Sequence, residues 1–380
     1  MPLVVVSVFY LFSLVENRES NVCRSEEKMN VELSPECLPW ARDAKEYRNI
    51  PLVSVFLRLL NRVGADKDFL YSSPLVVLPE GAGQILEPNN LRLLEFKKEY
   101  FDAVVSCGFP EESLEWCNDR IELDLPLRGF RGDCCYGWQK RDCNVPSAYI
   151  LTWLYLRTAG LNDCLSRHYE DGLFGAYSVE YDGRKISRDI IDSVLEIFFM
   201  KKMLTGLHGS SPVSVLDIGA GYGRLAHRLF EEGNFGQVIC TDGIPESSFI
   251  CDYYLKFRGV DSKASVCTPL NLSEQLKRSR PSVAVNIHTF STCSWRSVKW
   301  WMEILAENLI QHLFIVPNAG EDVGKTLLTT ESDGQRVDYS PILSDAGYEL
   351  ISCVPKYGIP EVQRFGVSPT HYYWFSRSKA

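Results

Sequence analysis

The stretch Val215-Leu216-Asp217-Ile218-Gly219-Ala220-Gly221-Tyr222-Gly223-Arg224-Leu225-Ala226 decides the expected fold. In it an apolar run ends in an aspartate and an isoleucine, and three glycines at alternate positions then lead into a helical pattern. Glycine lets a chain turn tightly from strand to helix, and it lets a ligand approach the backbone amides at the helix start, where the helix dipole is positive. The stretch therefore predicts a strand, a ligand-binding turn and a helix.

The spacing of the glycines indicates which ligand the turn holds. A dinucleotide fingerprint, G-x-G-x-x-G, started at Gly219 requires a third glycine at the position of Arg224. Asp242 ends the next expected strand, close to the interval of about 20 residues at which nucleoside-binding sheets place the acid for the ribose hydroxyls. An acid followed by G-x-G-x-G resembles motif I of the class I S-adenosylmethionine-dependent methyltransferases. The resemblance implies that fold, with S-adenosyl-L-methionine as the cofactor.

Short apolar runs alternate with helical segments after Gly206, which is the pattern of a doubly wound α/β sheet. We expect strands at 213–218, 237–241, 264–267, 283–287, 313–317, 348–354 and 371–376. A stretch rich in Gly and Pro links the last two strands, which favours an antiparallel hairpin over a crossover helix. The sequence therefore predicts a Rossmann-like methyltransferase domain over residues 211–380 that ends in a hairpin.

Two regions precede this domain. Residues 1–145 are predicted to be mixed and mostly helical, with one helix running from an Asn90 cap to a stop at Gly108. Residues 146–210 are predicted to form a connecting lid of helices with a hairpin that turns at Asp182-Gly183. The first region is expected to act as a lid, a substrate-binding region or an oligomerisation region, so a homo-oligomer is among the alternatives.

The composition limits which binding partners and which cellular compartment we expect for this protein. The 380 residues include 40 Lys and Arg against 49 Asp and Glu, a net charge of -9, so no global basic field gathers nucleic acid. The 13 cysteines are scattered and lack C-x-x-C spacing, which favours free thiols in the cytoplasm over disulfides or zinc. The apolar run 3–15 is too short to span a bilayer; it is expected to form a buried strand, with a signal or anchor as the alternative. We expect a cytoplasmic protein without stable membrane insertion.

Three stretches narrow the resemblance: Ile186 to Glu196, Gly219 to His227, and Asn286-Ile287-His288-Thr289-Phe290-Ser291. They are similar to a bacterial family of sugar O-methyltransferases, and the similarity extends over residues 147–380. It implies transfer of a methyl group to a hydroxyl of a sugar or glycosylated small molecule, that is, a glycosidic or polyol substrate. The chain departs from the family pattern at Thr292, Cys293 and Ser294, where members tend to carry an acidic residue and methionine.

The resemblance to the methyltransferases also implies cofactor contacts. Asp217 is expected to anchor the methionine amino group, and Asp242 to hold the ribose. The turn is expected to line the methionine tail with Gly219, Ala220, Gly221, Tyr222 and Gly223. Adenine is expected to lie against residues that follow the second and third strands, namely Gly243, Ile244, Leu270 and Asn271.

A sugar hydroxyl must lose its proton during methyl transfer, and histidine is the usual base near neutral pH. His288 follows the fourth strand, next to the first strand, at the switch point where doubly wound sheets bind ligands. We therefore expect His288 to be the base. His371, at the start of the last strand, is the alternative, and His227 in the helix after the glycine turn is expected to be packed.

Four polar side chains share one stripe of the helix that starts near Asp189: Asp189, Asp192, Ser193 and Glu196. The stripe either faces water or lines a polar ligand site, in which Asp189, Ser193 and Glu196 are the candidate substrate contacts. Its carboxylates are also candidates for holding a divalent metal, although the spacing does not require one. Three aromatic residues either stack on a sugar ring or belong to the core: Trp138, Trp153 and Tyr155.

Two other functions remain open. Methylation of amino groups in RNA or protein usually comes with a D/N-P-P-Y motif after the fourth strand, where this chain has Asn286-Ile287-His288-Thr289. The acidic charge further disfavours RNA. A catalytically inactive methyltransferase fold kept as an interaction module is the other alternative, favoured only if the folded chain fails to bind the cofactor.

Overall fold

The computed structural model describes residues 76–110, 127–132, 145–205, 212–233, 235–319 and 322–377. The strand expected over 3–15 and the side chain of Trp138 lie outside these residues. Among the residues described, no helix has the length and apolar character needed to cross a bilayer.

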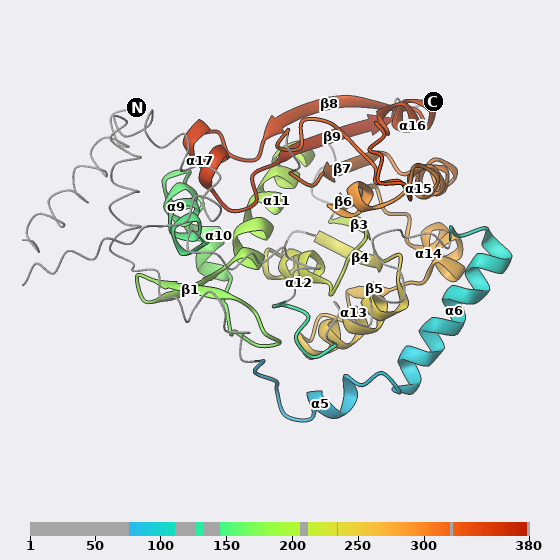
Figure 1. Ribbon diagram of the computed structural model, residues 1–380, viewed down its shortest axis with the longest axis horizontal. Coiled ribbons are helices and arrows are strands. Elements are labelled where there is room, and N and C mark those ends of the chain that lie inside the picture. The colour runs from blue at the N-terminus through green and yellow to red at the C-terminus, as the bar shows by residue number, and fades with distance from the viewer. Residues whose placement is uncertain are drawn as a thin grey trace, which may run out of the picture.

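A seven-stranded sheet forms the centre of the molecule (Figure 1). Its order is β5-β4-β3-β6-β7-β9-β8, with bounds β3 Val213–Ile218, β4 Phe235–Thr241, β5 Ala264–Val266, β6 Val283–Ile287, β7 His312–Val316, β8 Tyr348–Pro355 and β9 His371–Arg377. Neighbouring strands are parallel except for β9, which runs antiparallel to both β7 and β8. The expected doubly wound sheet with a C-terminal antiparallel hairpin, the class I methyltransferase fold, is confirmed.

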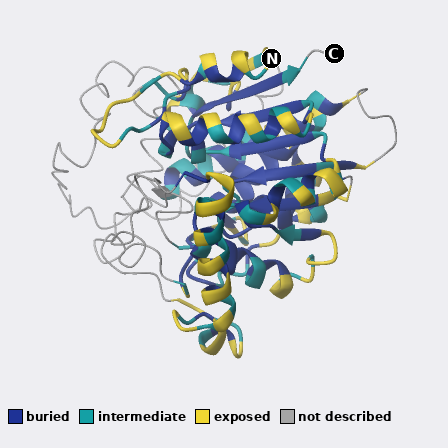
Figure 2. Cartoon of the chain, turned by 90° about the vertical axis from the view of Figure 1, so that its right-hand side faces the viewer, coloured by how far each residue is buried: buried dark blue, intermediate teal, exposed yellow. Residues whose placement is uncertain are grey.

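Helices cover both faces of this sheet: α11 Arg188–Leu204, α12 Arg224–Glu231, α13 Pro245–Phe257, α14 Leu272–Ser279, α15 Trp295–Glu307 and α16 Ser340–Asp345. The short helix α17 Pro360–Phe365 follows β8 and packs against the helix Val145–Thr158. Alternate residues of the central strands enter different apolar clusters. Val215 and Val285 pack with α11 and α12, whereas Leu216 and Ala284 pack with α14 and α15. Because both faces are covered, the central strands are buried almost throughout (Figure 2).

The switch point of the sheet lies between β3 and β6. The chain leaves β3 toward β4 on one side, and β6 pairs with β3 on the other, with Ile218 opposite Asn286. The Asn286 side chain donates from Nδ2 to the Ile218 carbonyl at 3.1 Å, which ties the two carboxyl ends together. The glycine turn after β3 and His288 after β6 therefore emerge side by side.

The predicted connecting region forms as helices around a hairpin: α9 Val145–Thr158, α10 Asn162–Arg167, β1 Ser178–Tyr181 and β2 Arg184–Ser187. The hairpin turns at Asp182 and Gly183, whose φ angles of 53° and 71° are the positive pair that a type I′ turn requires. Ser187 then caps α11, because its hydroxyl accepts from the Ile190 amide at 3.3 Å. The hairpin and both flanking helices are confirmed.

A long helix from the N-terminal region lies against the sheet domain. This helix, α6 (Leu91–Cys107), begins at the Asn90 cap and ends at Gly108, as predicted. It follows the short helix α5 (Ala82–Ile85) and packs on α13 and on the turn Pro269–Asn271 after β5 (Figure 1). The helix therefore borders the edge of the sheet at which adenine is expected.

Candidate active site

The glycine turn closes tightly against two neighbouring segments. Its φ angles are 75° at Gly219, 57° at Gly221 and 84° at Gly223. The amides of Gly219 and Ala220 donate to the Thr241 carbonyl at 2.8 and 3.0 Å. A Cβ atom built on Gly219 lies only 1.8 Å from Oγ1 of Thr289. Glycine at 219 is therefore required by the fold itself, in addition to any ligand that approaches the turn.

Asp217 places a buried carboxylate at the start of this turn. Asp217 is 3% exposed, and its carboxylate accepts no hydrogen bond from the residues described. Burial raises the pKa of Asp217 to about 7; Glu196 and Asp242 also raise it, and Arg224 opposes them. A carboxylate with unused acceptor capacity beside a turn suits an ammonium group, which would complete its hydrogen bonds and favour its charged form.

Asp242 holds the loop after β4 together. Its carboxylate accepts from the amides of Gly221, Gly243 and Ile244 at 2.9, 2.7 and 3.2 Å. Burial raises its pKa to about 6 against these hydrogen bonds and one from the Ser247 hydroxyl. Four donors fill a carboxylate. A ribose hydroxyl would therefore have to replace one of them.

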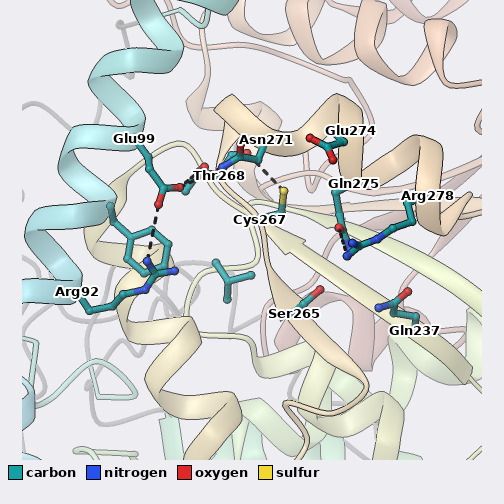
Figure 3. Close-up of a pocket in the computed structure, with 12 residues that line it drawn as sticks. Arg92, Glu99, Gln237, Ser265, Cys267, Thr268, Asn271, Glu274, Gln275 and Arg278 are labelled. Atoms are coloured by element: carbon teal, nitrogen blue, oxygen red, sulfur yellow. Dashed lines mark hydrogen bonds and ion pairs between the residues drawn. The ribbon is translucent and has the colours of Figure 1, made fainter.

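A pocket of about 420 Å³ lies beside β5 under α6 (Figure 3). Its polar lining includes Arg92, Glu99, Ser265, Thr268, Asn271 and Gln275. Glu99 accepts from Oγ1 of Thr268 at 2.7 Å and from Nδ2 of Asn271 at 3.4 Å. Of the residues expected around adenine, Asn271 lines this pocket, whereas Gly243, Ile244 and Leu270 do not.

Tyr222 turns its side chain into an aromatic cluster. Its ring centroid lies 5.4 Å from that of Phe130 and 5.2 Å from that of Tyr254. Its hydroxyl donates to Asp189 at 3.1 Å. The Tyr222 ring therefore contributes to packing between the glycine turn, α13 and the segment 127–132, and its contact with the methionine tail stays a prediction.

His288 stands at the carboxyl end of β6 in the left-handed region, with φ 68°. Its Nε2 atom lies 3.3 Å from Nη2 of Arg188. Because arginine can only donate, Nε2 accepts and the proton sits on Nδ1, which is buried without a partner among the described residues. Burial lowers the pKa of His288 to about 3, and Arg188 lowers it further. His288 is therefore neutral near pH 7, with its lone pair engaged.

The other two histidines named from the sequence make protein contacts. His371 begins β9 beside the end of β7, and its Nδ1 lies 2.8 Å from the Val323 carbonyl, to which it donates. His227 is buried in α12, 3.4 Å from the Tyr254 hydroxyl, and burial lowers its pKa to about 3. The structure thus agrees with a packed role for His227 and leaves His371 on the same sheet edge as His288.

The polar stripe of α11 does not face water, and that alternative was wrong. Asp189 accepts from Nε of Arg228 at 2.8 Å and from Nη2 of Arg131 at 3.0 Å. Burial would raise the pKa of Asp189, but Arg228 and Arg131 outweigh it and hold the pKa well below its usual range. Asp189 is therefore a buried structural anion that joins α11 to α12 and to the segment 127–132.

Two further acids of the stripe also face buried cations. Glu196 and Ser193 accept from Nη1 of Arg224 at 2.8 and 2.7 Å. Asp192 accepts from Nε of Arg188 at 2.7 Å and from Nζ of Lys356 at 2.5 Å. Within the parts of the chain that the structure describes, no group of three or more His, Cys, Asp or Glu side chains is arranged to hold a metal ion. The acids of the stripe would therefore contact a ligand only while they are also paired with arginine or lysine.

The aromatic candidates of α9 are largely packed. Trp153 is 4% exposed and lies under Arg184, whose guanidinium carbon is 5.6 Å from the Trp153 ring centroid. The Tyr155 ring meets the Tyr357 ring edge-on, with 5.5 Å between centroids. Both belong to or border the core beneath α9, which favours the core alternative for these two residues.

No protein-family profile and no curated protein matches the sequence of this chain. Magnesium protoporphyrin IX methyltransferase from Synechocystis PCC 6803, solved with bound S-adenosylmethionine, is 14% identical; the match covers 61% of this chain and 97% of that chain, with a TM-score of 0.36. The B. subtilis M1A22 tRNA methyltransferase is 12% identical over 45% of this chain and 63% of that one, with a TM-score of 0.32. A protein of the NADB-Rossmann superfamily from Streptococcus agalactiae is 14% identical over 48% and 68%, with a TM-score of 0.32. Because these TM-scores are low, the assignment of the fold is based on the order and orientation of the strands alone.

Proposed function

We propose that the protein is an S-adenosylmethionine-dependent O-methyltransferase that methylates a hydroxyl of a sugar or glycosylated small molecule. The proposed cofactor is supported above all by the state of Asp217. Its carboxylate is buried at the start of a glycine turn and accepts no hydrogen bond from the described residues. The turn lies at the switch point of a doubly wound sheet, where such folds bind ligands. The sugar class is supported by the sequence resemblance over residues 147–380.

The residues present fit this cofactor. Asp217 would pair with the amino group, the turn at Gly219 to Gly223 would approach the methionine tail, and Asp242 would exchange one of its donors for a ribose hydroxyl. When bound, S-adenosylmethionine supplies a sulfonium methyl carbon that forms a bond to the attacking oxygen, while the electron pair of the broken carbon–sulfur bond stays on sulfur. The protein's own task is to place the acceptor hydroxyl and to remove its proton.

His288 is the proposed base because it stands beside the glycine turn at the carboxyl end of β6. In the structure its Nε2 lone pair accepts from Arg188. Deprotonation of an acceptor therefore requires that Arg188 first release Nε2. Until then the Nδ1–H group of His288 can donate a hydrogen bond but cannot take a proton.

Transfer of a labelled methyl group from S-adenosylmethionine to a panel of sugars and glycosides tests the proposal. His288→Gln is expected to lower kcat by about 100-fold or more, the usual scale for loss of a general base. Asp242→Ala is expected to abolish transfer through loss of cofactor binding. His312→Gln is the matched control, because His312 lies at the opposite, amino end of β7 and contacts Ser376.

Retained activity in His288→Gln together with its loss in His371→Gln would move the base to His371. Transfer to RNA or protein but to no sugar would contradict the proposed acceptor class. A folded chain that neither binds cofactor nor methylates any acceptor of the panel would favour a non-catalytic module, which the engaged lone pair of His288 also supports.

A further inference from the structure

Arg188 leaves part of its guanidinium unused. Its Nε donates to Oδ2 of Asp192 at 2.7 Å, and its Nη2 donates to Nε2 of His288 at 3.3 Å. Its Nη1 is buried and has no hydrogen-bond partner among the described residues, while the side chain as a whole is 6% exposed. Leaving a buried N–H donor without a partner is unfavourable, and a ligand or water that accepts from it removes the penalty.

The charges around Arg188 do not balance. Lys356 also faces Asp192, and its three donors are used by Oδ1 of Asp192 at 2.5 Å and by two backbone carbonyls at 3.0 and 3.2 Å. Glu196 forms an ion pair with Arg224. Among the described residues, two cations, Arg188 and Lys356, therefore share one carboxylate, that of Asp192, which leaves one positive charge uncompensated at the buried guanidinium. The imbalance equals the charge of a single carboxylate, whereas a phosphate carries close to two.

We infer that Arg188 binds a carboxylate of the acceptor, and that this contact draws Nη2 away from His288 and frees Nε2 to take the proton of the acceptor hydroxyl. The inference rests on the proposed function and narrows its substrate class to acidic sugars and related hydroxy acids. Arginine presents two parallel N–H groups that match the two oxygens of a carboxylate, so an anion at Nη1 competes directly for Nη2.

The surroundings of His288 make this coupling effective. Four charged groups face it: Arg188 and Asp192 from α11, Arg224 from α12, and Lys356 after β8. Besides burial, which contributes most, the three cations lower the pKa of His288 and Asp192 raises it. A carboxylate on Arg188 adds a second negative charge and removes a donated hydrogen bond. Both changes favour protonation of His288.

Nitrogen NMR of the histidine rings, with S-adenosylhomocysteine present, tests the inference without any turnover. The probes are D-glucuronate and D-glucose, which differ in one carboxylate, and inorganic phosphate as a third arm. D-glucuronate is expected to shift the Nε2 signal of His288 toward that of a ring nitrogen that accepts no hydrogen bond. It is also expected to raise the pKa of His288 by roughly one to two pH units. D-glucose is expected to do neither. The His288→Gln variant assigns the signal.

Arg188→Gln is the decisive variant, and it is expected to fold because it leaves Asp192 and Lys356 as a balanced pair. In this variant Nε2 of His288 should already be free without a probe. The affinity for D-glucuronate should fall by about 10- to 100-fold, as expected for loss of a charge-assisted hydrogen bond. Arg157→Gln, which removes an exposed pair with Asp182, is the control and should respond like the wild type.

Each outcome separates this inference from the proposed function. Equal responses to D-glucuronate and D-glucose, a response to phosphate alone, or a D-glucuronate response that persists in Arg188→Gln would overturn the carboxylate site. Binding of S-adenosylhomocysteine without a carboxylate response would leave the methyltransferase standing and remove only this inference. A carboxylate response in a chain that does not bind S-adenosylhomocysteine would support the Arg188 site and contradict the proposed function.

Discussion

Replacing Gly219 by alanine is expected to destabilise the folded protein by about 2 to 5 kcal/mol. The left-handed backbone, with φ 75°, costs an L-residue about 1 to 2 kcal/mol by itself. The added methyl group also lies 1.8 Å from Oγ1 and 2.5 Å from Cβ of Thr289, so the segment after β6 has to move. Urea denaturation monitored by tryptophan fluorescence measures the change.

Gly233→Ala is the matched control for this substitution. Gly233 has nearly the same backbone, with φ 78°, but no atom of the described residues lies within 4 Å of its built Cβ atom. It should therefore cost only the backbone part, about 1 to 2 kcal/mol. In the Gly219→Ala background, Thr289→Gly should recover part of the lost stability because it removes the contacting atoms. Equal losses at Gly219 and Gly233 would show that the turn does not pack against Thr289 as described.

Asp189→Asn is expected to destabilise the protein by about 3 to 5 kcal/mol, because removing one member of a buried ion pair leaves the other charge uncompensated. Asp189 accepts from two buried guanidinium groups, those of Arg131 and Arg228. The exposed pair of Asp102 with Lys98 provides the control, and Asp102→Asn should change stability little. Thermal and urea unfolding of both variants against the wild type give the comparison.

The acid dependence of stability should change as well. The pKa of Asp189 is lower in the folded protein than in the unfolded chain. Its contribution is therefore present above the unfolded pKa of about 4 and is lost as the pH falls below it. The stability difference between wild type and Asp189→Asn should shrink on acidification. A difference that stays small at every pH would mean that the two arginines find other partners, and the network would not hold α11 in place.

The sheet and its flanking helices were predictable because their signals are local. The runs at 213–218 and 283–287 have the observed bounds, since apolar residues bounded by turns or glycines fix a buried strand within a few residues of sequence. Asn90 and Gly108 likewise mark the ends of α6, as a cap and a left-handed stop do in general. Boundary errors elsewhere in the sheet are one or two residues at strand ends.

The site was predictable only in part because its contacts join distant residues. The acids of α11 have helical spacing typical of an exposed face, yet Arg131, Arg224 and Arg228 reach them from other segments. No pattern within α11 reveals those partners. The placement of α6 over the pocket depends in the same way on Glu99 and Thr268, which lie far apart in the chain. For His288 the sequence indicates its position at the sheet edge, whereas its tautomer follows from the contact with Arg188.

Calorimetric titration of S-adenosylhomocysteine into the wild type and Asp217→Asn at about pH 8 tests the central claim most directly. Because the pKa of Asp217 is raised to about 7, its contribution to stability is lost as the pH rises through that value, and the ionised side chain is a cost to the ligand-free fold at pH 8. We predict that Asp217→Asn is at least as stable as the wild type yet binds S-adenosylhomocysteine about 10- to 100-fold more weakly. Equal affinity in the two proteins, or no binding by a folded wild type, would contradict the account.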